Sequence, residues 1–196
     1  RFLPLGGWAA SAVSAHKVRV RARDGSWVSG VVAAQPVHYL SAAERGKAPE
    51  IADMVIDVGA RSPEEVAGMG IGAGAPVVPD VLFEYNEKNG VMLGKAFDCR
   101  VGCAAVCDVL RELEGEELSV DVTGVLSSQE EVGDRGIQVA ARTVRPDLAI
   151  VFEGAPADDT FVPEAEIQTG LGRGVMLRHY DLGMITNPRF MRYALD

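Results

Sequence analysis

The sequence predicts an α/β fold in which a parallel-sheet domain follows a smaller β-rich domain. Strand patterns separated by turn residues fill the first half of the chain. Helical and apolar strand patterns alternate in the second half, which is typical of a parallel sheet. A polar stretch, Asn86-Glu87-Lys88-Asn89-Gly90, lies between the two halves. We therefore expect a β-rich domain at residues 1–88 and an α/β domain at residues 89–196.

The β-rich half is predicted from short local signals. Residues 18–21 alternate in polarity, Asp24-Gly25 is a hairpin turn signal, and residues 27–32 form a second strand pattern. Residues 53–58 are a further apolar strand pattern. Ser62-Pro63-Glu64-Glu65 combines an N-cap, a first-turn proline and a capping box, which predicts a short helix. Short strands with one small helix suggest a compact barrel or sandwich.

The second half alternates between helix and strand. Residues 103–113 place apolar side chains on one helical face, at Cys103, Val106, Val109, Leu110 and Leu113. A buried strand is expected at residues 118–126, a helix at 134–144 and an apolar strand at 147–152. This order predicts neighbouring parallel strands joined by a helix.

Composition excludes several classes of protein. No apolar run approaches the roughly 20 residues that cross a bilayer, so we expect no membrane span. The net charge of −9 argues against a general nucleic-acid binder, which would be basic. The three cysteines, at 99, 103 and 107, are too few and too close for a disulfide framework. A reducing compartment, and hence a cytoplasmic location, fits better.

Both ends of the chain suggest a piece of a longer protein. The chain starts at Arg1 without a methionine or a signal-peptide pattern. It stops at Asp196 within a helix that Asn187 and Pro188 are predicted to begin, and no helix stop signal precedes that end. We therefore expect the α/β domain to be incomplete at both ends.

Carboxylates follow or precede the predicted elements of the second half. Glu130 and Glu131 come after strand 118–126, Glu153 follows strand 147–152, and Asp98 precedes a helix. Ligands bind at the carboxyl ends of parallel strands, so these acids can meet at one sheet edge. Converging carboxylates repel one another unless cations neutralise them, which favours divalent metal. The alternative is that they are solvated loop acids.

The adjacent acids Glu130 and Glu131 should point in different directions. One of them can bind metal while the other moves a proton. Other patterns are weaker candidates for chemistry. The glycine pattern at residues 70–75 follows a predicted helix rather than a strand, which disfavours nucleotide binding. The three cysteines fall on one helical stripe, which favours core packing.

Five segments in a fixed order resemble the family of tetrahedral aminopeptidases, whose members are also described as glucanase-like or glutamyl aminopeptidase-like. The segments are Lys95-Ala96-Phe97-Asp98-Cys99-Arg100-Val101-Gly102, Ser128-Gln129-Glu130-Glu131-Val132-Gly133, Arg135-Gly136, Pro146-Asp147 and Glu153. The resemblance implies a parallel-sheet metallopeptidase domain with an inserted β-barrel-like dimerisation domain. It implies a hydrolase that removes N-terminal residues from short peptides.

The resemblance also assigns roles to the acids. Asp98 corresponds to the carboxylate that bridges two divalent metal ions, most often zinc or cobalt. Glu131 corresponds to a ligand of one ion and Glu153 to a ligand of the other. Glu130 corresponds to the general base that handles protons for the metal-activated water. The family's dimers assemble into large hollow complexes, so we expect a homo-oligomer.

The sequence departs from the family pattern in two respects. The family's histidine ligands lie before the position of Arg1 and after that of Asp196, and His16, His38 and His179 do not replace them because no pair has ligand spacing. Cys99 follows the bridging aspartate where the family usually has Asp or Asn. We therefore expect the intact protein to be active and this chain by itself to be inactive.

Two other functions remain open from the sequence. The chain could belong to a non-catalytic oligomerisation or binding protein that lacks the histidine ligands. It could also belong to a related metal-dependent deacylase or glucanase-like hydrolase. Glycoside cleavage needs a pair of acids flanking a sugar, whereas the acids here are committed to metal.

Overall fold

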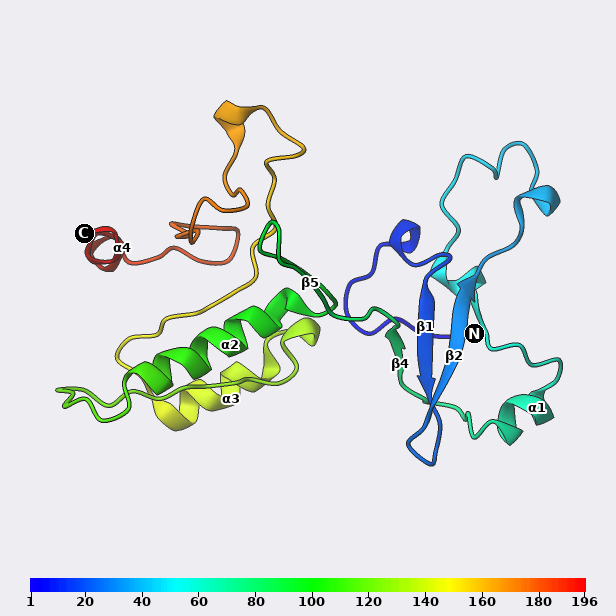
Figure 1. Ribbon diagram of the computed structural model, residues 1–196, viewed down its shortest axis with the longest axis horizontal. Coiled ribbons are helices and arrows are strands. Elements are labelled where there is room, and N and C mark those ends of the chain that lie inside the picture. The colour runs from blue at the N-terminus through cyan, green and yellow to red at the C-terminus, as the bar shows by residue number, and fades with distance from the viewer. The chain divides into compact units, whose positions relative to one another are not determined.

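The computed structural model describes residues 1–196, which form two compact units (Figure 1). Unit 1 comprises Arg1–Ala96 and Leu110–Ala149, and unit 2 comprises Phe97–Val109 and Ile150–Asp196. The predicted division into domains at residues 1–88 and 89–196 stays a prediction. None of the helices combines the length and the apolar content that a membrane crossing requires.

A four-stranded antiparallel sheet forms the centre of unit 1 (Figure 1). Its strands are β1 (Lys17–Arg21), β2 (Trp27–Ala33), β3 (Val55–Asp57) and β4 (Val77–Pro79). Their order across the sheet is β3-β2-β1-β4, and each neighbouring pair is antiparallel. The sheet is therefore open, with short edge strands on both sides.

The predicted hairpin between β1 and β2 is confirmed. The Asp24 carboxylate accepts hydrogen bonds from the Ser26 N–H at 2.9 Å and the Ser26 hydroxyl at 2.7 Å. Gly25 has a φ of +87°, a conformation that glycine adopts without strain. This local chemistry depends on neighbouring residues alone, which is why the sequence indicated it.

One face of the sheet carries the hydrophobic core of unit 1. Met54 is fully buried, and it packs in one cluster with Val13, Val18 and Val32. Partly buried apolar residues surround this cluster, namely Phe2, Ala10, Ala34, Ile51 and Ile56. Alternate residues of β1 contribute Val18 and Val20, as expected for a strand with one buried face.

An ion-pair cluster fastens β4 to β1. Asp80 follows β4 and lies 2.9 Å from the Lys17 ammonium and 2.6 Å from the Arg19 guanidinium. The Asp80 side chain is only 5% exposed. Hydrogen bonds and positive charge from Lys17 and Arg19 lower the pKa of the Asp80 carboxyl group below its ordinary value.

The remaining elements of unit 1 are a capped helix, a hairpin and a second helix. Helix α1 (Pro63–Gly68) begins as predicted, because the Ser62 side chain accepts a hydrogen bond from the Glu65 N–H. Strands β5 (Glu84–Asn86) and β6 (Val91–Leu93) pair antiparallel. Helix α3 (Arg135–Val144) confirms the helix predicted at residues 134–144.

The other helices are α2 and α4. Helix α2 (Phe97–Glu112) contains the predicted helix at residues 103–113 apart from its last residue. Helix α4 (Pro188–Leu195) begins where Asn187 and Pro188 predict, with the Asn187 side chain accepting from the Arg189 N–H at 2.9 Å. Single 3-10 turns are η1 (Ala10–Ala12), η2 (Val37–Tyr39), η3 (Ile51–Asp53), η4 (Glu130–Val132) and η5 (Glu164–Glu166).

Two parts of the predicted fold do not form within this chain. Residues 118–126 and 147–152 are not strands, so the chain contains antiparallel sheets and no parallel one. The β-rich part is an open sheet with a separate hairpin rather than a closed barrel. The physical reason is pairing, since a strand needs a hydrogen-bonded neighbour and an apolar pattern does not identify one. Many apolar side chains in both segments are exposed, among them Val120, Val122, Leu126, Ile150 and Val151.

Candidate metal centre

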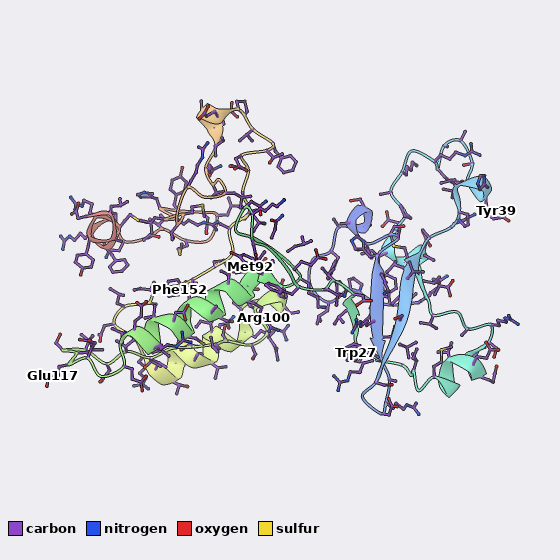
Figure 2. All side chains as sticks on the ribbon, in the orientation of Figure 1. Trp27, Tyr39, Met92, Arg100, Glu117 and Phe152 are labelled. Carbon is purple, nitrogen blue, oxygen red and sulfur yellow. The ribbon has the colours of Figure 1, made fainter.

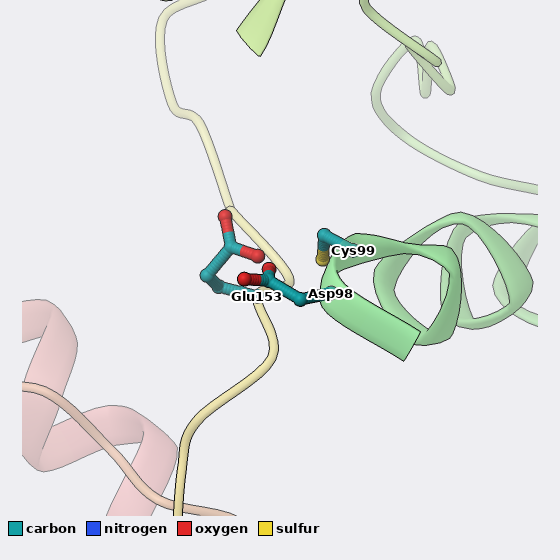
Figure 3. A group of neighbouring side chains, drawn as sticks. All are labelled: Asp98, Cys99 and Glu153. Carbon is teal, nitrogen blue, oxygen red and sulfur yellow. The ribbon is translucent and has the colours of Figure 1, made fainter. Parts of the chain in front are cut away.

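Asp98 and Glu153 lie side by side in unit 2 (Figure 3). Asp98 is at the beginning of α2, and Glu153 is in a segment without regular secondary structure between α3 and η5. One oxygen from each carboxylate and the sulfur of Cys99 all lie within 4.8 Å of one another. Two carboxylates at this separation repel each other, so a cation between them would be favourable.

The backbone at the start of α2 is not helical, and this sets the direction of the Asp98 and Cys99 side chains. Asp98 has φ −84° and ψ 114°, and Cys99 has φ −113° and ψ 59°. The interpretation of Cys99 as part of one helical stripe with Cys103 and Cys107 is therefore wrong. Cys99 turns toward Glu153 instead (Figure 3).

Gly102 allows the segment carrying Glu153 to approach α2 closely. Gly102 is the buried residue of this helix. A Cβ atom at this position would collide with the Phe152 carbonyl oxygen and would lie 2.7 Å from the Cys99 sulfur. A glycine in this turn is thus required by the contact itself, which brings residues 152 and 153 against the start of the helix.

Hydrogen bonds and charge keep Glu153 ionised. A hydrogen bond from the Cys99 side chain lowers the pKa of the Glu153 carboxyl group most, and contributions from the Gly154 N–H, the Asp98 side chain and the charge of Arg178 lower it further. The Gly154 N–H donates to Glu153 Oε1 at 2.9 Å. Burial raises the pKa of the Cys99 thiol, and the neighbouring Glu153 raises it further. The pair therefore combines an anionic carboxylate with a protonated thiol.

The donor set fits a divalent cation. Two carboxylates supply hard oxygen ligands, and their side chains are exposed enough for an ion to reach them. Carboxylate oxygens bind zinc as well as other first-row divalent ions. Asp98 and Glu153 are therefore the residues of this cluster that could hold a metal ion, with Cys99 beside them.

Glu130 and Glu131 are built into a tight loop of unit 1. Both lie in η4, which begins after Gln129 in a left-handed conformation with φ 61°. The Gly136 N–H donates to the Ser128 carbonyl oxygen at 2.9 Å, and a Cβ on Gly136 would collide with the Ser128 backbone. Because these acids and the Asp98–Glu153 pair belong to different units, the predicted gathering of all four carboxylates stays a prediction.

Two residues that influence Glu153 were not given a role from the sequence. Cys99 shares the site, and Arg178 contributes positive charge to Glu153. The position of Cys99 next to Asp98 was a usable signal for the first. The sequence offered no such signal for Arg178, because its effect on Glu153 depends on the path of residues 154–178.

Comparison with known proteins gives a consistent match. The family model for M42 glutamyl aminopeptidase matches residues 1–196. The glutamyl aminopeptidase of Lactococcus lactis subsp. cremoris is 33% identical over 199 residues, covering 100% of this chain and 55% of that protein. The crystal structure of a TET aminopeptidase from Thaumarchaeota archaeon SCGC AB-539-E09 is similar with a TM-score of 0.89 and 38% identity, covering 97% of this chain and 54% of that chain.

A more distant solved structure adds information on assembly. Pyrococcus horikoshii TET1 peptidase, which can assemble into a tetrahedron or a large octahedral shell, is similar with a TM-score of 0.62 and 27% identity. That match covers 72% of this chain and 42% of the TET1 chain. The present chain spans about half the length of the curated relatives it matches.

Proposed function

This chain belongs to the M42 glutamyl aminopeptidase family, and from that membership we propose that the intact protein is a metal-dependent aminopeptidase acting on short peptides. The observation that carries the proposal is the pairing of Asp98 with Glu153 in a chain that the family model matches from end to end. Two carboxylates held together beside a glycine that permits the contact support this proposal, because such a pair can be neutralised by a bound cation.

The proposed metal centre uses three carboxylates. Asp98, Glu131 and Glu153 would hold two divalent cations, zinc or cobalt, with Asp98 serving both ions, Glu131 one of them and Glu153 the other. The lowered pKa of Glu153 supports its part, because an ionised carboxylate is the form that binds metal. Cations bound there would lower the pKa of a water molecule and polarise the carbonyl of the scissile peptide bond.

Glu130 is the proposed general base. A carboxylate within hydrogen-bond reach of the attacking water can accept its proton and deliver it to the departing amine. The η4 turn supports a division of labour between Glu130 and Glu131, because consecutive residues of a tight turn project in different directions. In this arrangement the Glu131 carboxylate would hold metal, and the Glu130 carboxylate would move the proton.

We assign the predicted parallel sheet and barrel-like domain to the intact protein. There, residues 118–126 and 147–152 join a parallel sheet, and the β-rich part closes into a barrel-like dimerisation domain. The exposed apolar side chains of both segments support this, since they gain stability once neighbouring strands cover them. Dimers that assemble further into a hollow homo-oligomer in the cytoplasm complete the proposal, supported by the assembly of Pyrococcus horikoshii TET1.

The test uses the full-length protein and short peptides with free or acetylated N-termini. We expect release of the N-terminal residue from free peptides only, and we expect a chelator to abolish it and added zinc or cobalt to restore it. Glu130→Gln should lower this activity about a hundredfold or more, because a general base usually contributes a factor of that size. Failure to release any amino acid with metal present would contradict the proposal.

Glu117→Gln is the matched control for Glu130→Gln. Glu117 is an exposed acid in the turn region after α2, and it is labelled in Figure 2. Both substitutions remove one negative charge and keep the size of the side chain. Equal activity of the two variants would show that Glu130 does not act in catalysis.

A further inference from the structure

Cys99 occupies a position that the proposed metal ligands do not explain. Its sulfur lies within 4.8 Å of the donor oxygens of both Asp98 and Glu153 (Figure 3). The backbone around Cys99 is non-helical, so the side chain does not follow the line of α2. Cys99 is half-buried in the site, whereas Cys107 on the same helix is exposed.

The contacts of Cys99 join the start of α2 to the segment that carries Glu153. The thiol donates a hydrogen bond to the Phe152 carbonyl oxygen, with the sulfur 3.4 Å away. The same sulfur also lies within 4.8 Å of a Glu153 carboxylate oxygen. A single thiol thus contacts the residue before Glu153 and lies close to the Glu153 carboxylate.

Space for this arrangement is provided by Gly102. A Cβ on Gly102 would lie 2.7 Å from the Cys99 sulfur, so the thiol fills the gap that the missing side chain leaves. The sulfur is held between the helix backbone, the Phe152 carbonyl and Glu153. Such packing restricts the rotamer of Cys99 and therefore the direction of its hydrogen bonds.

We propose that Cys99 is a positioning residue whose thiol, by donating a hydrogen bond to the Phe152 carbonyl oxygen, holds the Glu153 carboxylate beside Asp98 in the orientation that binds a divalent cation. The inference rests on the proposed function, and it adds that Cys99 acts through Glu153 and does not bind the ion. The Cys99 sulfur lies at hydrogen-bond distance from the Phe152 carbonyl oxygen, which places the thiol as a donor to the backbone rather than as a ligand of the ion.

The experiment measures metal affinity rather than activity alone. Full-length wild type, Cys99→Ala and Cys99→Ser are compared by competition for cobalt and zinc with a chromogenic chelator. Removing a partner that orients a metal ligand typically weakens metal binding by about 10- to 100-fold, and we expect this of Cys99→Ala. Cys99→Ser keeps a donor at the same position, so we expect it to bind within about threefold of wild type.

Cys103→Ala is the control for loss of a cysteine from the same helix. Cys103 is half-buried like Cys99 but does not belong to the Asp98–Glu153 cluster. The metal affinity of Cys103→Ala should equal that of wild type. Circular dichroism of each variant checks folding, and Cys99→Val, which also lacks a donor, replaces Cys99→Ala if the alanine variant does not fold.

The outcomes separate the inference from the function on which it rests. If the wild-type protein binds no metal, the proposed function itself is wrong. Wild type that binds metal no better than Cys99→Ala would overturn the positioning role and leave the metal centre intact. A sulfur-to-cobalt charge-transfer band in wild type that disappears in Cys99→Ser would show that the sulfur is a ligand, which also overturns the inference.

Discussion

The backbone carbonyl of Phe152 lies directly against Gly102, with no room for a side chain between them. This contact places Glu153 next to Asp98 at the start of α2. Gly102→Ala must therefore move the helix or the segment, because the obstructing atoms are backbone. We expect it to lower the free energy of unfolding by about 1–3 kcal/mol, as overpacking does, and to weaken metal binding. Urea denaturation and chelator competition on the full-length protein measure the two effects.

Gly154→Ala provides the comparison for Gly102→Ala. A Cβ on Gly154 would lie 3.5 Å from the Asp98 Cα and carboxylate, which is ordinary van der Waals contact. This variant should keep its stability and its metal affinity. If Gly154→Ala and Gly102→Ala behave alike, the close approach at Gly102 is not what organises the site.

A second glycine governs the loop that carries Glu130 and Glu131. A Cβ on Gly136 would collide with the backbone of Ser128, so Gly136→Ala must displace the loop that precedes η4. We expect a fall in kcat/KM of about a hundredfold, since small misplacements of catalytic groups have effects of this size. Peptide hydrolysis at saturating metal measures it. Gly7→Ala, where a Cβ would meet nothing within 4 Å, should leave the rate unchanged.

Local features of the fold could be predicted from the sequence, and features that depend on distant partners could not. The Asp24-Gly25 turn and the Ser62 cap each involve hydrogen bonds within a few residues, and both form as predicted. The segments 118–126 and 147–152 have apolar strand patterns, yet pairing depends on neighbours that a pattern does not name. For this reason the parallel sheet was predicted but does not form in this chain.

The candidate site could also be predicted only in part from the sequence. Glu153 was selected because it follows a predicted strand and Asp98 because it precedes a predicted helix, and the structure does bring these two together. Their roles as ligands, and those of Glu130 and Glu131, stay predictions. Cys99 was assigned to a helical stripe because cysteines recur every four residues. The non-helical backbone at Asp98 and Cys99 breaks that periodicity, and no residue type in the segment indicates the break.

The Asp80 ion pairs predict how the stability of the sheet changes with pH. The folded-state pKa of Asp80 lies below its ordinary value of 3.8. A group with a lowered folded-state pKa stabilises the fold above its unfolded-state pKa, and this contribution is lost as the pH falls through the folded-state value. Asp80→Asn should therefore be less stable than wild type at neutral pH, and the difference should shrink as the pH falls below 3.8.

Urea denaturation of wild type and Asp80→Asn across this pH range tests the expectation. Asp53→Asn is the control, because Asp53 is an exposed carboxylate, whereas Lys17 and Arg19 form their ion pairs with Asp80. A difference between wild type and Asp80→Asn that stays constant down to the lowest pH would show that the ion pairs with Lys17 and Arg19 are not its source.

Metal binding to Asp98 and Glu153 should also raise the free energy of unfolding of the full-length protein. An ion that binds only the folded state stabilises it by about 2.7 kcal/mol when its free concentration is about 100 times the Kd. We therefore expect zinc or cobalt to raise the unfolding temperature and a chelator to reverse the rise. Asp98→Asn should lose most of this shift, because a bridging ligand serves both ions, and Glu153→Gln should lose part of it. Glu117→Gln should keep the full shift, and an equal shift in all three variants would place the stabilising ion elsewhere.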